Sequence, residues 1–154
     1  MTPNFDSGSI PTSLRNPGFL LNQSARIVAQ MVGDCLSPMK LQTQEFGLLR
    51  ILSIYGPINQ QSFASKYNMD RTTVTQLVDG LENRDYVIRE KNPLDRRENL
   101  LHLTPSGKRV FTRAARAVKA RQKEFLTPLS NAEWEQLQEL LVRLIEFHVT
   151  TDKG

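Results

Sequence analysis

The sequence predicts a mainly α-helical fold that carries one small β-hairpin. Apolar residues recur at helical spacing in three long segments, residues 17–36, 43–55 and 130–148. Two shorter helical patterns, joined by a turn, lie between residues 60 and 83. Two alternating strand-like runs then flank a polar loop that contains a proline. This order of elements, helix, turn, helix and hairpin inside a helical frame, defines the expected fold class.

Length and composition limit the possible protein classes. A chain of 154 residues is typical of one domain with a single core. No stretch of about 18 apolar residues occurs, so no membrane span is expected, and the N-terminus, with Asp6 and no apolar run, does not resemble a signal peptide. The single cysteine, Cys35, cannot form an internal disulfide. We therefore expect a cytoplasmic protein.

The N-terminal region predicts an arm followed by a long helix. Residues 1–16 are rich in Ser, Thr, Pro and Asn and predict a mobile arm, or an extension that packs only in an assembly. The helix over residues 17–36 is indicated by the spacing of Phe19, Leu20, Ile27, Val28 and Met31. Ser37-Pro38 is expected to interrupt this helix.

A second helix is predicted from Thr43, as its cap, to Tyr55. Its apolar residues are dense enough for burial on more than one side: Phe46, Leu48, Leu49, Ile51 and Leu52. Gly56-Pro57 is expected to end it.

The central segment predicts two short helices. The first covers residues 60–66, the turn is Tyr67-Asn68-Met69, and the second begins at Asp70 and runs to about Asn83. Asp70 is well placed to cap this helix, because its carboxylate can accept from first-turn N–H groups. The predicted buried stripe is Val74, Leu77, Val78 and Leu81. The other face is short, polar and rich in donors: Arg71, Thr72, Thr73, Thr75 and Gln76.

The C-terminal half predicts a hairpin and two long helices. The strands are residues 87–91 and 99–103, so the loop between them is an exposed tip. Thr104-Pro105 is a cap with proline at the first helical position, which predicts a helix to about Phe125. The last helix is expected to begin at a capping box, Ser130-x-x-Glu133.

Net charge is +4 and the isoelectric point is about 9.5, which permits nucleic-acid binding without indicating it. Residues 60–103 carry seven basic and seven acidic residues, so this segment is formally neutral. Residues 104–125 carry seven basic residues and one acid, a charge of +6. DNA affinity would therefore depend on the placement of a few basic groups rather than on overall charge.

A polar helix supported by a smaller one suits the DNA major groove, where its side chains reach base edges and phosphates. The sequence from Met69 to Glu82 resembles the recognition helix of the multiple antibiotic resistance regulator (MarR) family of transcription factors. Residues 87–97 resemble that family's wing, including an Asp-x-Arg signature at Asp95 and Arg97. Residues 103–107 resemble its entry into the next helix, and the similarity covers roughly residues 19–148.

The resemblance implies a homodimeric winged helix-turn-helix regulator. Residues 17–148 would form one MarR-like domain, with a winged lobe over 43–103 whose wing is 87–103. Residues 17–36 and 104–148 would be intertwined dimerisation helices, and 149–154 a tail. Apolar faces larger than one lobe can cover agree with this, and the expected dimer contacts are Phe19, Trp134, Leu137, Leu141 and Leu144. The implied partner is double-stranded DNA with a pseudo-palindromic operator.

Individual DNA contacts follow from the resemblance and from residue chemistry. Arg97 would enter the minor groove, Asp95 would hold the wing loop, and Arg96 is a weaker candidate. Gln76 stands where the family often has a basic residue, so its base contact is open. Phosphate anchors would be Gln60, Gln61, Lys66, Arg84 and Lys91. The alternative is that these residues form only a solvated helix face and turn.

In this family the regulator is most often a repressor that a small anionic aromatic molecule releases from its operator. Arg26, Phe46 and Arg50 are candidates for such a site; the alternative is that Phe46 is core and both arginines pair with local acids. Cys35 could instead sense oxidants, as some family members do, or be an inert buried thiol. A winged helix can also act as a protein-interaction or architectural module that does not read sequence.

Catalysis is not expected. Only two histidines and one cysteine are present, with no metal-ligand spacing, Gly-rich phosphate loop or nucleophile motif. We therefore predict a protein that is not an enzyme and that has no metal or other cofactor.

Overall fold

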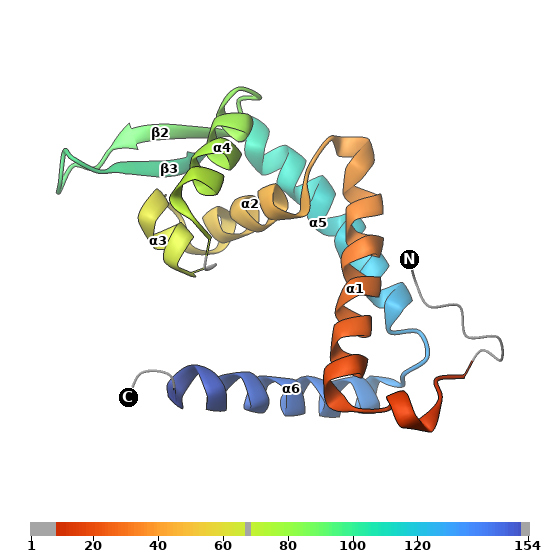
Figure 1. Cartoon of the computed structure of the whole chain (residues 1–154). Coiled ribbons are helices and arrows are strands. Elements are labelled where there is room, and N and C mark those ends of the chain that lie inside the picture. The colour runs from red at the N-terminus through yellow and green to blue at the C-terminus, as the bar shows by residue number, and fades with distance from the viewer. Residues whose placement is uncertain (1–8, 67–68, 152–154) are drawn as a thin grey trace.

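The computed structural model describes residues 9–66 and 69–151, and it is mainly helical with one small antiparallel sheet (Figure 1). The helices are α1 (Pro17–Leu36), α2 (Thr43–Tyr55), α3 (Gln60–Lys66), α4 (Arg71–Glu82), α5 (Pro105–Phe125) and α6 (Asn131–Thr151), with short 3-10 helices η1 (Thr12–Leu14) and η2 (Ser37–Met39). The strands are β1 (Ile58–Asn59), β2 (Val87–Lys91) and β3 (Asn99–Leu103). The predicted fold class and order of elements are confirmed; the predicted turn residues Tyr67 and Asn68 lie outside the described residues.

The sheet has one strand more than the sequence analysis expected. Strand order is β1-β3-β2, with all neighbours antiparallel, so β3 is central. Ile58 pairs with Leu101, and on the other side of β3 Val87 pairs with Leu103. The predicted hairpin of β2 and β3 is confirmed, and β1 is an additional strand that the sequence analysis did not predict. A two-residue strand shows no alternation, and only its partner defines it.

One apolar core joins the winged lobe to α5. Phe63 of α3, Val78 of α4, Leu49 of α2 and Leu101 of β3 are all almost completely buried in it. The predicted stripe of α4 is buried in full: Val74, Leu77, Val78 and Leu81. Ala114 and Val118 of α5 belong to the same cluster, so α5 is packed against the lobe that precedes it.

The helix caps follow the sequence with one correction. Side chains of Asn16, Asp70 and Thr104 accept from the first-turn N–H groups of α1, α4 and α5. The second helix is capped by Gln42 and not by Thr43. Glu45 explains the difference, because its carboxylate accepts from the backbone N–H of Gln42 at 2.9 Å and fixes the start of α2 one residue earlier.

The last helix starts as expected and ends later. Glu133 Oε2 accepts from the Ser130 N–H at 2.7 Å, and the Glu133 N–H donates to Ser130 Oγ at 3.3 Å, which is the predicted capping box. Helix α6 continues to Thr151, so part of the predicted 149–154 tail is helical. At the other end, η1 places a 3-10 turn within the predicted arm.

Helices α1 and α5 pack against each other, and in the view of Figure 1 α6 runs below the winged lobe, on the same side of α1 as the lobe. The apolar stripe of α6 is largely open to solvent: Leu137, Leu140, Val142, Leu144, Ile145, Phe147 and Val149 are all exposed. No helix among the described residues is long and apolar enough to cross a membrane.

Gly107, in the first turn of α5, is expected to tolerate no side chain. A Cβ there would lie 2.0 Å from the backbone oxygen of Tyr86 and 2.9 Å from Leu103 Cδ2. Gly107→Ala should therefore lower the free energy of unfolding by roughly 3 kcal/mol. Gly33→Ala is the matched control within α1, because a Cβ at Gly33 meets nothing within 4 Å. This variant should raise the free energy of unfolding by less than about 1 kcal/mol. Urea unfolding at one protein concentration measures both, and equal effects would contradict the close approach of α5 to Tyr86.

Candidate nucleic-acid interface

Helix α4 exposes its polar face along its whole length. Val74 and Leu77 are buried, whereas Arg71, Thr72 and Gln76 are exposed. The N-terminus of the helix is fixed by Asp70, whose Oδ1 accepts from the Thr73 N–H at 2.9 Å. The sequence thus builds a rigid, solvent-facing row of amide, guanidinium and hydroxyl groups.

Two of the predicted hydroxyls are already used within α4. Thr73 Oγ1 donates to Asp70 Oδ2 and is half-buried. Thr75 Oγ1 donates to the Arg71 carbonyl at 2.9 Å. Both hydroxyls can still accept a hydrogen bond, but the proton of each is already donated to a partner in α4 or its cap. Thr72 and Gln76 are therefore better placed to donate to an external partner than Thr73.

The cap has a defined pH dependence. The hydrogen bond from the Thr73 hydroxyl, supported by the Thr73 N–H, lowers the pKa of Asp70 below its ordinary value. Since the folded-state pKa is depressed, the stabilisation from this cap is present above the ordinary pKa and is lost as pH falls through the lowered one. At neutral pH the cap is fully ionised.

A groove runs between α3, α4 and the base of the wing. Its lining includes five of the residues predicted to bind DNA: Gln60, Gln61, Arg71, Thr75 and Arg97. They come from segments almost forty residues apart, and the fold brings them to one surface. The structure thus brings these five predicted DNA contacts, from α3, α4 and the wing, to one groove.

Arg89 organises this surface, and the sequence analysis did not identify it. Its guanidinium lies on β2 and pairs with Asp79 and Glu82 of α4. Its Nε donates to Gln60 Oε1 of α3 at 3.2 Å. Gln60 is thus engaged in positioning Arg89 as well as lining the groove. The only signal in the sequence was a basic residue in the predicted strand that follows α4, together with two acidic residues one helical turn apart on α4.

Arg84 does not join the interface. Its guanidinium pairs with the buried carboxylate of Glu45 and donates to the carbonyls of Gly80 and Lys40. The same group lies 5.3 Å from the centre of the Tyr86 ring. An arginine held by these partners joins the end of α4 to the start of α2, so we leave Arg84 out of the proposed phosphate anchors. Lys91, by contrast, is exposed at the end of β2.

The wing tip is a hydrogen-bonded turn. Asp95 Oδ1 accepts from the Arg97 N–H at 3.0 Å, and the Asp95 carbonyl accepts from the Glu98 N–H at 3.0 Å. Asp95 therefore holds the loop backbone, as its sequence position predicted. Arg96 and Arg97 are both exposed.

Several acidic residues of the formally neutral segment 60–103 have partners within the lobe. Asp79 and Glu82 are compensated by Arg89, while Asp70 and Asp95 accept backbone N–H groups. Three arginines extend from the same surface into solvent: Arg71, Arg96 and Arg97. The groove region is consequently more positive than the count of residues suggests.

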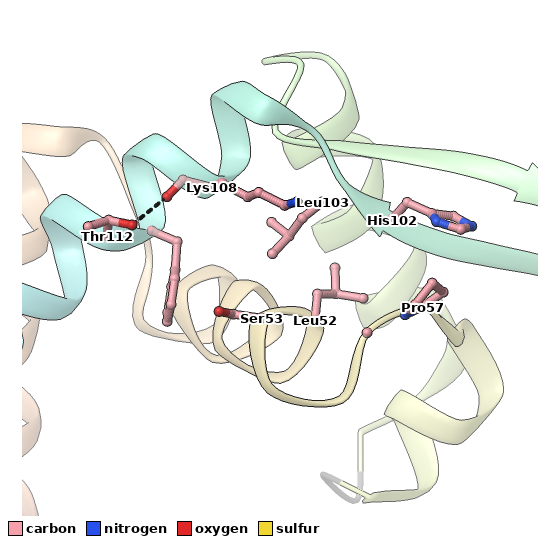
Figure 2. A pocket seen from close by; sticks show the side chains of 9 residues that line it. Leu52, Ser53, Pro57, His102, Leu103, Lys108 and Thr112 are labelled. Atoms are coloured by element: carbon pink, nitrogen blue, oxygen red, sulfur yellow. Dashed lines mark hydrogen bonds between the residues drawn. The ribbon is translucent and has the colours of Figure 1, made fainter.

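A second hollow, of about 560 Å³, lies on a different part of the lobe between the end of α2, β3 and the start of α5 (Figure 2). Leu52 and Leu103 point toward each other across it, and Phe111 adds an aromatic wall. Lys108 and His102 lie at its rim, and His102 faces Glu90 at 3.4 Å.

The predicted ligand residues do not line this hollow. Phe46 is buried and stacks on Phe111 with 5.7 Å between ring centroids, so the alternative reading of Phe46 as core is the correct one. Arg26 donates to Gln23 at 3.2 Å on exposed α1, and Arg50 is exposed on α2. None of these three residues lines the groove beside α4 or the hollow between α2, β3 and α5.

Cys35 is half-buried, and its Sγ donates to the Val32 carbonyl at 3.2 Å. Burial raises the pKa of the thiol, and the nearby Arg121 guanidinium opposes the shift only in part. A reactive cysteine requires stabilisation of the thiolate. This environment does the reverse and does not favour the oxidant-sensor alternative.

Comparison with known proteins agrees with this arrangement. Residues 41–99 match the model of the MarR family. YdcH, an HTH-type transcriptional regulator of Bacillus subtilis, is 33% identical over 132 residues, which are 82% of this chain and 90% of YdcH. The chain belongs to the MarR family. A regulatory protein assigned to the hcr operon of Thauera aromatica is 32% identical over 99 residues, 64% of this chain but only 60% of that protein.

The MarR fold also extends beyond the matched segment. A variant of MarR from E. coli, solved in complex with operator DNA, superposes with a TM-score of 0.77 over 89% of this chain and 99% of that chain, at 21% identity. This likeness shows the fold. Membership of a family of transcriptional regulators also places the chain outside the enzymes, as expected.

Proposed function

We propose that this MarR-family protein is a sequence-specific DNA-binding regulator, and that it acts in the cytoplasm as a homodimeric repressor. One observation carries the proposal: residues of α3, α4 and the wing with the chemistry to contact bases and phosphates lie around a single groove. The acids Asp79 and Glu82 pair with Arg89. Arg71, Arg96 and Arg97 face solvent.

The dimensions of the lobe fit duplex DNA. Helix α4 has twelve residues, about 18 Å of helix, and a major groove about 12 Å wide admits it. The five-residue strands of the wing extend roughly 16 Å. In Figure 1 the hairpin projects sideways past α4. With α4 in the major groove, the wing tip would cross the phosphate ridge to the adjacent minor groove.

The structural neighbour from E. coli, which was solved with operator DNA, supports DNA as the partner. An enzyme-like or purely architectural role has no comparable support in the arrangement of the groove. Base contacts would come from the exposed face of α4, and phosphate contacts from Gln61, Lys91 and Arg96.

Binding to enriched DNA tests the proposal. A pool of random duplexes enriched on the protein should yield a pseudo-palindrome with half-site centres about 10 bp apart. Arg71→Ala and Gln76→Ala should each weaken binding to that site by about 1–3 kcal/mol and leave random DNA nearly unaffected. Arg97→Ala should also flatten the salt dependence, because each phosphate-directed cation contributes about 0.9 to its slope.

Asp95→Ala tests whether Asp95 holds the wing loop or only adds negative charge near DNA. It removes a negative charge near DNA but also the acceptor of the Arg97 N–H, so weaker binding is expected. Tighter binding of Asp95→Ala to DNA would show that Asp95 acts only by repelling the DNA phosphates and that the wing tip is a solvated turn. Equal affinity of the wild-type protein for enriched and random DNA would indicate a module that does not read sequence.

We further propose that α1, α5 and α6 form the dimer interface, with residues 17–36 and 104–148 contributed by each subunit. Support comes from the exposed apolar face of α6, on which Leu144 is 53% and Phe147 65% exposed. A contiguous apolar surface of this kind is typical of an interaction site. Phe19, Trp134 and Leu141 are half-buried within the single chain, and Leu137 is exposed.

Leu144→Asp tests this interface. Leu144 is exposed in the single chain, so the variant should fold, but burial of an unpaired carboxylate between two subunits costs several kcal/mol. Sedimentation should then show monomers at micromolar concentration. Gln138→Asp, at an exposed polar position of α6, is the matched control and should leave the dimer intact. A dimer that survives Leu144→Asp would exclude this face.

A small anionic aromatic molecule is the proposed effector, and the hollow between α2, β3 and α5 is its proposed site. The hollow has the apolar walls and the single flexible cation that such a molecule requires. Lys108 would face the carboxylate and Phe111 the ring.

Benzoate is a suitable probe, with benzamide as its neutral counterpart. Benzoate at millimolar concentration should shift the NMR signals of Leu52, Leu103 and Phe111 and lower DNA affinity, and benzamide should do less. Lys108→Gln should remove the difference between the two probes, whereas Arg26→Gln should not. Signal changes confined to Arg26, Phe46 and Arg50 would instead favour the site predicted from the sequence.

A further inference from the structure

Leu94, at the tip of the wing, is the most exposed large apolar side chain among the described residues, with 94% of its surface open to solvent. Its neighbours in the turn are polar or charged except Pro93. Most of the other exposed apolar residues lie on α1 and α6, where a second subunit of the proposed dimer would cover them, while Ile54, Tyr55 and Ile88 are exposed on α2 and β2. The loop between β2 and β3, which contains Leu94, lies at the end of the lobe remote from α1 (Figure 1).

The backbone around Leu94 is held in place. The Leu94 N–H donates to Asn92 Oδ1 at 3.0 Å, and the Asn92 N–H donates to the Glu98 carbonyl at 3.0 Å. The Glu98 carboxylate in turn accepts from the side chains of Asn92 and Asn59, each at 3.2 Å. Asn59 directly precedes α3 and caps it through the Ser62 N–H. The wing tip is thereby anchored to the helix that supports α4, and it presents Leu94 outward in a fixed position.

An apolar group at this position suits one kind of DNA surface. In the minor groove, A·T pairs offer acceptors and no donor, whereas a G·C pair adds the guanine N2 amino group. A leucine placed against the groove floor would cover that amino group without hydrogen bonding to it, which leaves a buried donor unsatisfied. Apolar wedges are common among proteins that contact the minor groove.

We propose that Leu94 is a specificity residue of the wing, which makes the protein prefer A·T over G·C pairs by direct contact with the minor-groove floor. This inference rests on the proposed function. It differs from the role of Arg97, whose attraction depends on groove width and potential. The contact of Leu94 would instead be weakened by the N2 amino group of a guanine in the minor groove.

Inosine separates the two roles. An I·C pair keeps the major-groove pattern of G·C but lacks the minor-groove amino group. Hydroxyl-radical footprinting first locates the base pair beneath the wing, as the pair that the wild-type protein protects and Arg97→Ala does not. Three duplexes would then carry A·T, G·C or I·C at this pair. The wild-type protein should bind the A·T and I·C duplexes about equally, and the G·C duplex about 5- to 10-fold more weakly.

Leu94→Asn and Leu94→Met are the matched variants. Asparagine has a polar side chain that can accept from the amino group, so Leu94→Asn should reduce the discrimination against G·C to less than about 2-fold. Methionine keeps the apolar character, so Leu94→Met should retain the discrimination. Both substitutions are fully exposed and should leave stability within about 0.5 kcal/mol.

Each outcome has a distinct meaning. Discrimination that persists in Leu94→Asn overturns the inference but leaves DNA binding intact, and equally weak binding to I·C and G·C does the same. Failure of the wild-type protein to prefer any enriched duplex overturns the proposed function itself. If Leu94→Asn instead changes the sedimentation of the free protein, Leu94 contacts a second copy of the chain and the inference is wrong.

Discussion

The guanidinium of Arg89 is the contact on which the geometry of the winged lobe depends. It projects from β2, pairs with Asp79 and Glu82 on α4, and donates to Gln60 on α3. An exposed ion pair contributes only about 0–1 kcal/mol to stability, so the importance of Arg89 lies in orientation. Three elements that would contact DNA share one rigid planar group with several fixed donors. The distance from α4 to the wing is consequently set before any DNA arrives, which reduces the ordering cost of binding.

This arrangement also explains how a formally neutral segment can serve as an anion-binding surface. The acids of the segment are the groups that shape it: Asp70 starts α4, Asp79 and Glu82 hold β2, and Asp95 closes the wing turn. Their charges are directed toward internal N–H groups or Arg89. Three of the arginines, Arg71, Arg96 and Arg97, are exposed to solvent. Net charge therefore describes the composition of the lobe, while hydrogen bonding decides which sign reaches the surface.

Local signals in the sequence predicted the elements well, and long-range partners account for what they missed. The caps at Asp70, Thr104 and Ser130 depend on neighbours within three residues, and all three form as expected. Strand β1 was missed because only its pairing with β3 defines it. Arg84 was assigned to DNA because its partner, Glu45, lies 39 residues away and is invisible to any periodic pattern. The same limit applies to the proposed ligand site: residue types suggested arginines on α1 and α2, whereas the hollow that we propose as the site is lined by residues of α2, β3 and α5.

Strand β3 connects the two regions assigned a binding role. Asn99, at its start, lines the groove beside α4, and His102 and Leu103, at its end, line the hollow. The strand passes directly into α5 through Thr104, whose hydroxyl donates to the Asp85 carbonyl at 2.6 Å. A ligand can shift a conformational equilibrium only by its difference in affinity between two states. Arg89 ties α4 to β2, and Arg84 ties α4 to α2, so a displacement of α2 or β2 would carry α4 with it. In the proposed dimer, a ligand between α2, β3 and α5 would therefore change the angle between the lobe and the proposed dimerisation helices. This would change the spacing of the two recognition helices without altering either helix itself.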